Sequence, residues 1–442
     1  MVSPARAAAF DILLRVEQQQ AYAGELLHSH RLQELAAADR GLCTELVMGV
    51  LRWQSWLDRG ISGVSSKPLQ KLDPEVLIAL RLAAYQIGFL QRVPGRAAVN
   101  ESVELVKRAR KGSAAPFVNA VLRKLADQPA LLQPSRTSGP KTASELADQY
   151  AHPQWLVERW AGAYGVEAAE KICEYDQAVP EAAVRLRGAA VEDELPGTEL
   201  APGRMLASAR RLKFGHLAHA PGLAQGRLAV QDEASQLVAL LVGHGQRFLD
   251  CCAAPGGKTA ILAERNPEAT LVAADLHPHR ARLLQRLLPC GSRVHIIAAD
   301  ATRLPLAGDF DRVLVDVPCS GTGTLARNPE IKWRLQPQDL TDLHERQVAI
   351  LKAALERVSH GGRVVYSSCS LEREENAAVV EEALAARVDF RLLDCRAELQ
   401  GLRESGELVW EDLESLVEGL YLRTIPGVHP CDGFFAAVVE RE

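Results

Sequence analysis

Apolar residues recur at helical spacing in the first part of the chain. After Asp73, the apolar positions up to Leu90 follow the period of an α-helix, and further helical stretches follow the breaks at Pro94-Gly95 and at Gly112-Ser113. Several helices of this length with short breaks are typical of a compact bundle. The pattern therefore predicts an all-α bundle over residues 1–130.

Two helix starts and a linker complete this prediction. Ser3-Pro4 and Asp73-Pro74 each place a capping side chain before a proline suited to a first helical turn. Proline, serine and glycine then accumulate over residues 131–143, which is typical of a linker. Helical periodicity resumes near Ser144, and the mixed stretch that follows predicts a small α/β bridging subdomain over residues 144–228.

The last part of the chain, residues 229–442, alternates short apolar strands with helical stretches. The expected strands are residues 247–250, 270–275, 293–297, 311–316 and 363–367. This alternation predicts an α/β Rossmann-like domain built on a doubly wound parallel sheet. Ligands bind such sheets at the carboxyl ends of the strands, so we look for functional residues there.

Composition narrows the class of protein. The 442 residues are 47% hydrophobic and 24% charged, which is a globular balance with material for more than one core. The sequence contains no uninterrupted apolar run of 18 residues and no recognisable secretory signal at its start, so we expect no membrane span. Nine cysteines, an odd number, favour reduced thiols and a cytoplasmic protein.

The charge is unevenly distributed. The chain carries a net charge of −5, but residues 1–135 contain 17 basic and 12 acidic residues, which leaves −10 for the remainder. A basic cluster at residues 107–111 supplies much of this excess. A basic module on an acidic body suggests an anionic partner, nucleic acid first, and the alternative is a solvated helical face.

The segment from Asp250 to Thr259 reads Asp-Cys-Cys-Ala-Ala-Pro-Gly-Gly-Lys-Thr, between a strand and a helix. Glycines there allow a ligand to approach the backbone, and the free amides at a helix start favour an anion. The spacing fits neither a Walker A loop nor a dinucleotide fingerprint, because position 252 is Cys and only Gly256-Gly257 is present. A tight strand–helix turn without a ligand is the alternative.

Two acidic residues follow the next two strands. Asp275 lies 18 residues after Gly257, where an acid hydrogen-bonds ribose hydroxyls in this architecture. Asp300 follows the third strand and is placed to meet an adenine amino group. Each acid alone could equally be a helix cap, but with the loop they describe a pocket for an adenosine with a polar tail.

Two cysteine motifs end the last two expected strands. They are Asp316-Val-Pro-Cys-Ser-Gly-Thr-Gly323 and Tyr366-Ser-Ser-Cys-Ser370, and their cysteines should converge on one ligand site. A zinc site is disfavoured, because neither Cys319 nor Cys369 has a Cys-x-x-Cys or His pair beside it. Three other cysteines are expected to be small buried hydrophobic residues, namely Cys43, Cys173 and Cys395.

Together with the loop at 250–259, these motifs resemble the RNA 5-methylcytosine methyltransferase family, and the helical first part resembles the NusB-like RNA-binding domain. That fusion is similar to the bacterial RsmB (Sun/Fmu) family of 16S ribosomal RNA methyltransferases. Further segments agree, namely Val230-Gln-Asp-Glu-Ala-Ser235, Asn328-Pro-Glu-Ile-Lys-Trp333, Glu374-Glu-Asn376 and Asp432-Gly-Phe-Phe435. Two departures, Ser368 for the usual Thr and Val317 for the usual Ala, remove no reacting group.

The resemblance implies methylation of cytosine carbon 5 through a covalent cysteine adduct, with no metal. It makes Cys369 the nucleophile on carbon 6, Asp316 the partner of ring nitrogen 3, and Cys319 the residue needed for release. It implies S-adenosylmethionine as the cofactor. The residues expected to hold that cofactor are Cys252, Ala253, Ala254, Pro255, Gly256, Gly257, Lys258, Asp275, Asp300 and Asp316.

The expected substrate is 16S ribosomal RNA, with the protein acting as a monomer. The target base must leave its stack for a thiol to reach it. Arg327, Lys332 and Trp333 could touch the RNA, and Trp333 could equally be a packing residue. Alternatives are a cytosine of another RNA such as tRNA, and a non-catalytic RNA-binding or antitermination factor, which would need neither thiol. An exocyclic-nitrogen methyltransferase would carry a different motif at Asp316, and a DNA enzyme would attack with Cys319.

Overall fold

The computed structural model divides into two compact units. The first comprises Met1–Val179 with Leu325–Arg334, and the second comprises Pro180–Thr324 with Leu335–Glu442. Within these units the structure describes residues 2–29, 32, 34–133, 141–187, 195, 197–215, 217, 221–224, 227–288 and 293–442. No helix in these ranges is both long and apolar enough to cross a membrane.

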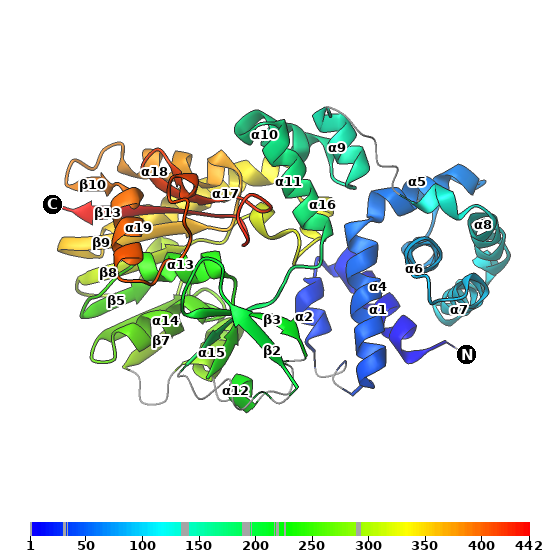
Figure 1. Ribbon diagram of the computed structural model, residues 1–442, viewed down its shortest axis with the longest axis horizontal. Coiled ribbons are helices and arrows are strands. Elements are labelled where there is room, and N and C mark those ends of the chain that lie inside the picture. The colour runs from blue at the N-terminus through cyan, green and yellow to red at the C-terminus, as the bar shows by residue number, and fades with distance from the viewer. Residues whose placement is uncertain are drawn as a thin grey trace. The chain divides into compact units, whose positions relative to one another are not determined.

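The first unit is helical, as the apolar periodicity predicts (Figure 1). Its longer helices up to residue 127 are α1 (Pro4–Gln19), α2 (Ala23–Leu27), α4 (Ala37–Arg52), α5 (Gln54–Val64), α6 (Pro74–Phe89), α7 (Gly95–Arg108) and α8 (Ala115–Asp127). Helix α6 is apolar on nearly every side, and its residues 78–84 are all buried, because helices α1, α4, α5, α7 and α8 all contact it. The bundle therefore forms around α6.

The two expected helix caps are not made. Ser3 and Asp73 occupy the positions before α1 and α6, but neither side chain accepts a hydrogen bond from its helix. Ser3 Oγ instead accepts from Arg6 Nη1 at 3.0 Å, and Asp73 pairs with Lys111 Nζ at 3.1 Å. Arg6 and Lys111 thus bind the side-chain oxygen atoms of Ser3 and Asp73 that a helix cap would use.

A short segment from late in the chain also belongs to the first unit. It contains α16 (Ile331–Arg334), where Lys332 is only 1% exposed and donates from Nζ to the carbonyl of Arg52 at 3.0 Å. Trp333 donates from Nε1 to the carbonyl of Leu51 at 2.5 Å. The expectation that Lys332 contacts RNA is therefore wrong, because its ammonium group is buried against α4.

The expected bridging segment, residues 144–228, contributes to both units. Its helices α9 (Ala143–Gln149), α10 (Gln154–Tyr164) and α11 (Val166–Gln177) belong to the first unit. Its strands form an antiparallel sheet in the second unit, in the order β2 (Glu199–Pro202), β3 (Ala209–Phe214), β1 (Ala183–Leu186) and β4 (Leu228–Val230), with α12 (Pro221–Ala224) before β4. Most of the expected linker, residues 134–140, lies outside the described residues.

The main sheet of the second unit has the order β11-β12-β13-β9-β8-β5-β6-β7, and β10 also pairs with β13. Strands β5 to β9 run parallel, and β13 is antiparallel to β9. The strand bounds are β5 (Arg247–Asp250), β6 (Thr270–Asp275), β7 (Val294–Ala298), β8 (Phe310–Asp316), β9 (Val358–Ser368), β10 (Phe390–Leu393), β11 (Val417–Glu418), β12 (Tyr421–Thr424) and β13 (Phe434–Arg441). The five expected strands are confirmed, and β9 begins earlier than predicted.

Alternating residues of each strand face opposite layers of helices, which flank the sheet in Figure 1. Phe248 packs with the core formed by α13 (Glu233–Leu241), α14 (Gly257–Arg265), α15 (Pro278–Leu287) and α19 (Cys395–Glu404). Leu249 packs with the core formed by α17 (Pro337–Leu355) and α18 (Ala377–Leu384). The strand order reverses between β5 and β8, so the carboxyl ends of these strands form the switch point where ligands bind such sheets.

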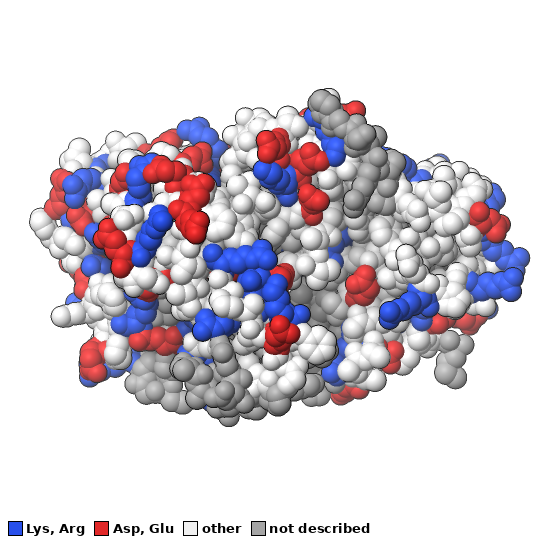
Figure 2. Space-filling view, viewed as in Figure 1, with Lys and Arg blue, Asp and Glu red and all other residues white. Residues whose placement is uncertain are grey.

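The basic cluster at residues 107–111 is largely neutralised. Lys107 pairs with Glu104 at 2.6 Å and Arg108 pairs with Asp11 at 2.9 Å, while Lys111 pairs with Asp73. Figure 2 shows a separate gathering of basic side chains over β2 and β3. There, Arg204, Arg211 and Lys213 share the single carboxylate of Glu181.

Candidate functional site

The loop after β5 turns sharply into α14. Gly256, the residue before the helix, has φ of +113°, and a Cβ built there would lie 2.8 Å from Leu284 Cδ2. Only glycine avoids both the backbone strain and this contact. Gly256 therefore has a local structural cause, in addition to any role in approaching a ligand.

A buried acid lies at the base of this loop. Asp250, the last residue of β5, is 1% exposed and accepts a hydrogen bond from Thr259 Oγ1 at 2.7 Å. Burial raises the pKa of Asp250 from 3.8 to about 7, the Thr259 hydrogen bond opposes this rise, and the charge of Asp316 adds to it. This carboxyl group is thus held near its protonation midpoint at neutral pH.

Asp275 ends β6 and is nearly buried. Its Oδ2 accepts from the amide of Ala254 at 3.3 Å and its Oδ1 accepts from the amide of His277 at 3.0 Å. Each oxygen therefore retains a lone pair for another donor. The acid also holds the loop after β5 against the end of β6.

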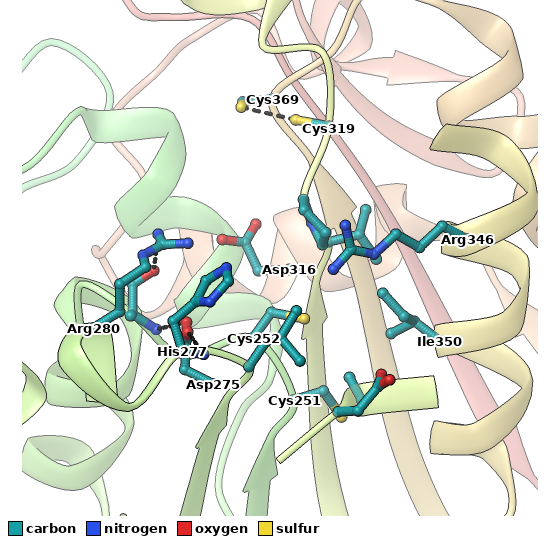
Figure 3. A pocket seen from close by; sticks show the side chains of 16 residues that line it. Cys251, Cys252, Asp275, His277, Arg280, Asp316, Cys319, Arg346, Ile350 and Cys369 are labelled. Carbon is teal, nitrogen blue, oxygen red and sulfur yellow. Dashed lines mark hydrogen bonds between the residues drawn. The ribbon is translucent and has the colours of Figure 1, made fainter. Parts of the chain in front are cut away.

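These strand ends surround a cavity of about 290 Å³ (Figure 3), close to the lower end of the range of about 300–1,000 Å³ usual for ligand pockets. Seven of the expected site residues line it, namely Cys252, Ala254, Asp275, Asp300, Asp316, Cys319 and Cys369. The other expected loop residues are adjacent to this lining. Ala253 is buried with its amide bonded to the carbonyl of Ala274, Gly256 is buried at the turn, and Pro255 is exposed.

Asp300 caps a helical turn and also lines the cavity. Its Oδ1 accepts from the amide and the hydroxyl of Thr302 at 2.9 and 2.8 Å, at the start of the 3-10 turn Ala301–Arg303. These two hydrogen bonds lower the pKa of Asp300. The acid is therefore charged and fixed in direction, which suits it to accept from an amino group.

Asp316 lies between two donors at the end of β8. Its Oδ2 accepts from Lys258 Nζ at 2.8 Å, and its Oδ1 accepts from Ser367 Oγ at 2.8 Å. The ammonium group of Lys258 also lies 5.0 Å from the ring centre of Phe434, within the range of a cation–π contact. Lys258 thus contacts the catalytic candidate Asp316 and does not itself line the cavity.

The two strand-end cysteines converge, as the sequence predicts. Cys319 Sγ and Cys369 Sγ lie 3.0 Å apart, and both side chains line the cavity (Figure 3). The hydrogen bond to Cys369 and burial raise the pKa of Cys319 well above its usual value. The Cys319 thiol therefore keeps its proton at neutral pH and can donate a hydrogen bond to Cys369 Sγ.

The cysteines expected to be structural are confirmed as buried. Cys43, Cys173 and Cys395 are each 0% exposed, and burial raises the pKa of each thiol. Cys251 is 1% exposed, whereas Cys252 is only partly buried and contributes to the cavity wall. Cys43, Cys173 and Cys395 thus lie away from the cavity, whereas Cys319 and Cys369 line it.

Sequence reasoning missed several residues of the cavity. Leu276, His277 and Arg280 follow Asp275 directly, so their nearness to that acid was the signal that could have found them. Arg346 and Ile350 come from α17, and Figure 3 shows the Arg346 side chain extending from that helix into the cavity. Neither Arg346 nor Ile350 lies in a sequence motif that could have identified it as a site residue.

The residues present fit an adenosine with a charged tail. Asp275 offers two carboxylate oxygens to a pair of hydroxyl groups, and Asp300 offers an acceptor to an amino group. Leu276 and Ile350 supply apolar wall for a flat ring, and Arg280 and Arg346 are the cations of the lining. This donor set suits S-adenosylmethionine.

Comparisons with known proteins identify the family of the chain. Residues 237–440 match the model of the family described as 16S rRNA methyltransferase RsmB/F, and residues 3–127 match the NusB family. A probable ribosomal RNA small subunit methyltransferase B from Bacillus subtilis is 35% identical over 99% of this chain and 98% of its own length. The ribosomal RNA small subunit methyltransferase B of Pseudomonas syringae is 34% identical over 82% of this chain and 83% of its own length.

Solved structures share the fold. One crystal structure covers 100% of both chains with a TM-score of 0.79 at 22% identity. A methyltransferase homolog from Pyrococcus horikoshii has a TM-score of 0.54 at 24% identity, over 68% of this chain and 99% of its own. With the extent and identity of the curated relatives, these findings show that the chain belongs to the RsmB/F family of methyltransferases and carries a NusB-family region at its N-terminus.

Proposed function

We propose that this protein methylates carbon 5 of a cytosine in 16S ribosomal RNA through a covalent adduct with Cys369. S-adenosylmethionine is the methyl donor of its family, and when bound it supplies a methyl group that a carbon nucleophile can attack. The observation that carries the proposal is the 3.0 Å separation of Cys319 Sγ and Cys369 Sγ in the wall of the cavity. A binding protein needs no such pair of thiols.

Cys369 is the nucleophile. Carbon 5 of cytosine reacts poorly, and a thiolate that adds to carbon 6 turns the ring into an enamine whose carbon 5 is nucleophilic. The raised pKa of Cys319 keeps the proton on its thiol, and a hydrogen bond from that thiol stabilises a thiolate at Cys369. The pair is thus divided into a nucleophile and a proton holder.

Asp316 acts on the opposite side of the ring. Attack on carbon 6 places negative charge on the ring, and a proton or hydrogen bond at nitrogen 3 stabilises it. Asp316 is a neighbour of both cysteines in the cavity wall, and the Lys258 ammonium group in contact with it is a proton donor at hand. We therefore assign the contact with nitrogen 3 to Asp316.

Cys319 completes the reaction. After methylation, the proton on carbon 5 must leave before the bond to Cys369 can break. Cys319 first releases its own proton to solvent, and the resulting thiolate is a strong base because the pKa of this thiol is raised, which suits Cys319 to take the proton from carbon 5. Cys369 then leaves as a thiolate and the aromatic ring is restored.

The substrate assignment follows the curated relatives, whose names specify the small ribosomal subunit. Relatives of similar length suggest that the whole chain serves one activity. We propose that it acts in the cytoplasm as a monomer. The NusB-family region would hold the surrounding RNA through phosphates, but the ion pairs of its 107–111 cluster reduce the charge available there.

Two cysteine variants test the mechanism. Cys369→Ala should give neither methylated RNA nor covalent adduct, because attack on carbon 6 is lost. Cys319→Ala should methylate once and then remain bonded to the RNA, which a slow RNA-dependent band on a denaturing gel would reveal. The reverse pattern would mean that Cys319 is the nucleophile, and full methylation by both variants would exclude the covalent mechanism.

The position and identity of the substrate need a separate measurement. Bisulfite sequencing of 16S rRNA from a strain that lacks this protein should show the loss of one protected cytosine. Restoring the gene should bring the protection back, whereas restoring it with Cys369→Ala should not. An unchanged 16S pattern with a change in another RNA would move the activity to that RNA.

A further inference from the structure

Glu375 is a buried carboxylate that the mechanism above does not use. It ends the 3-10 turn Arg373–Glu375 after β9 and is 0% exposed. Its Oε1 accepts from the amide of Ser320 at 2.8 Å and from Gln347 Nε2 at 2.9 Å. Its Oε2 accepts from the hydroxyls of Ser320 and Ser370, the latter at 2.5 Å. A buried carboxylate needs several hydrogen-bond donors to offset the free-energy cost of its desolvation, and Glu375 has four.

The partners of this carboxylate adjoin the two reactive thiols. The two serines directly follow Cys319 and Cys369 in the sequence. Gln347 Nε2, which donates to the carboxylate, also donates to the carbonyl of Pro318 at 2.9 Å, on the other side of Cys319. One carboxylate therefore ties together the backbone on which both thiols are mounted.

We propose that Glu375 is a positioning residue that sets the distance between the Cys319 and Cys369 thiols. This inference rests on the proposed function, in which the two thiols act on adjacent carbons of one ring. The 3.0 Å contact between the sulfur atoms is made by side chains on two separate loops. Without the tie at Glu375 those loops lose a bridge that spans both cysteines. The amide of Gly323 still donates to the carbonyl of Cys369 at 2.9 Å, and each loop keeps its own strand.

The chemistry of the tie predicts which substitution preserves it. In Glu375→Gln, the amide oxygen can replace Oε1 and accept from Ser320 and Gln347. The amide NH₂ then replaces Oε2 and donates to the two serine hydroxyls, whose oxygens can accept. Glu375→Ala removes every one of these bonds and leaves the amide of Ser320 buried without an acceptor. Glu375→Gln should therefore preserve the thiol–thiol distance that Glu375→Ala loses.

Thiol proximity can be measured without RNA or cofactor. Diamide converts two neighbouring thiols to a disulfide and takes up their two hydrogens itself. The tryptic peptides that contain Cys319 and Cys369 then appear as one linked mass. We expect the linking rate of Glu375→Ala to fall at least tenfold, and that of Glu375→Gln to stay within threefold of the unsubstituted protein. Glu381→Ala, at a half-exposed glutamate paired with exposed Arg373, should match the unsubstituted protein.

A second measurement follows the reaction. In Glu375→Ala we expect at least a tenfold lower kcat with KM values for RNA and S-adenosylmethionine within twofold. The RNA adduct should accumulate, because removal of the carbon 5 proton depends on the position of the Cys319 thiol more than the earlier steps do. If Glu375 served only to stabilise the fold, Glu375→Ala would lower the folded fraction and would not increase the amount of RNA adduct.

Equal linking rates in the Ala, Gln and unsubstituted proteins would overturn the proposal. If Glu375→Ala does not fold by circular dichroism, Ser320→Ala removes one hydroxyl bond of the tie and should lower the linking rate about threefold. An unchanged rate in that variant would equally refute the role. If linking falls as expected but Cys319→Ala forms no adduct, the proposed reaction fails while the positioning role of Glu375 stands.

Discussion

Replacing Asp250 by Asn should change how the stability of the second unit depends on pH. Burial raises the pKa of this carboxyl group from 3.8 to about 7. An acid whose pKa is higher in the folded protein favours folding fully below pH 3.8 and loses that contribution as the pH rises to about 7. At about 1.4 kcal/mol for each tenfold change in proton affinity, the loss is about 4 kcal/mol. The substituted amide cannot ionise and keeps the acceptor for Thr259.

Urea denaturation followed by circular dichroism, at pH values from 4 to 8, measures this difference. The free energy of unfolding of Asp250→Asn should equal that of the unsubstituted protein near pH 4 and exceed it increasingly up to pH 7. Asp309→Asn, at an exposed carboxylate of the same unit, controls for the loss of an acidic residue. A constant difference between Asp250→Asn and the unsubstituted protein across this range would refute the argument that burial keeps Asp250 neutral.

Two further predictions concern the cofactor and the helical unit. Asp275→Ala should weaken S-adenosylmethionine binding at least tenfold in calorimetry, because the carboxylate oxygens expected to accept from ribose are lost. An unchanged affinity would refute the assignment of Asp275 to the ribose. Burial lowers the pKa of Lys332 to about 7, so its contribution to stability is present above pH 10.5 and is lost as the pH falls toward 7. Lys332→Met should abolish this pH dependence in urea denaturation, and a slope that persists in the variant would contradict it.

The parts of the fold that follow local periodicity could be predicted from the sequence. The strands at 247–250 and 270–275 have the expected bounds because a buried parallel strand is a short apolar run between breaks. The meeting of Cys319 and Cys369 was also predictable, since their motifs end expected parallel strands and such ends lie at one edge of a sheet. Local patterns thus sufficed to predict that the thiols of Cys319 and Cys369 lie together.

The remaining features depend on partners far away in the sequence. The burial of Lys332 needs the carbonyl of Arg52, 280 residues earlier, and no periodicity connects the two. Arg346 reaches the cavity only because α17 covers the sheet beside β8. Glu375 is one acid among many in the sequence, and only the positions of the serines beside both cysteines show what it holds together.

The placement of residues 325–334 in the first unit has a consequence for synthesis on the ribosome. Helices up to residue 179 emerge first, but the carbonyls of Leu51 and Arg52 must wait for their partners Trp333 and Lys332. At roughly 5–20 residues per second, the 280 residues that separate Arg52 from Lys332 take about 14–56 s to synthesise. During this interval the nascent helical unit presents an unfinished surface, so a chaperone that protects it would have to act before translation reaches the second half of the catalytic sheet.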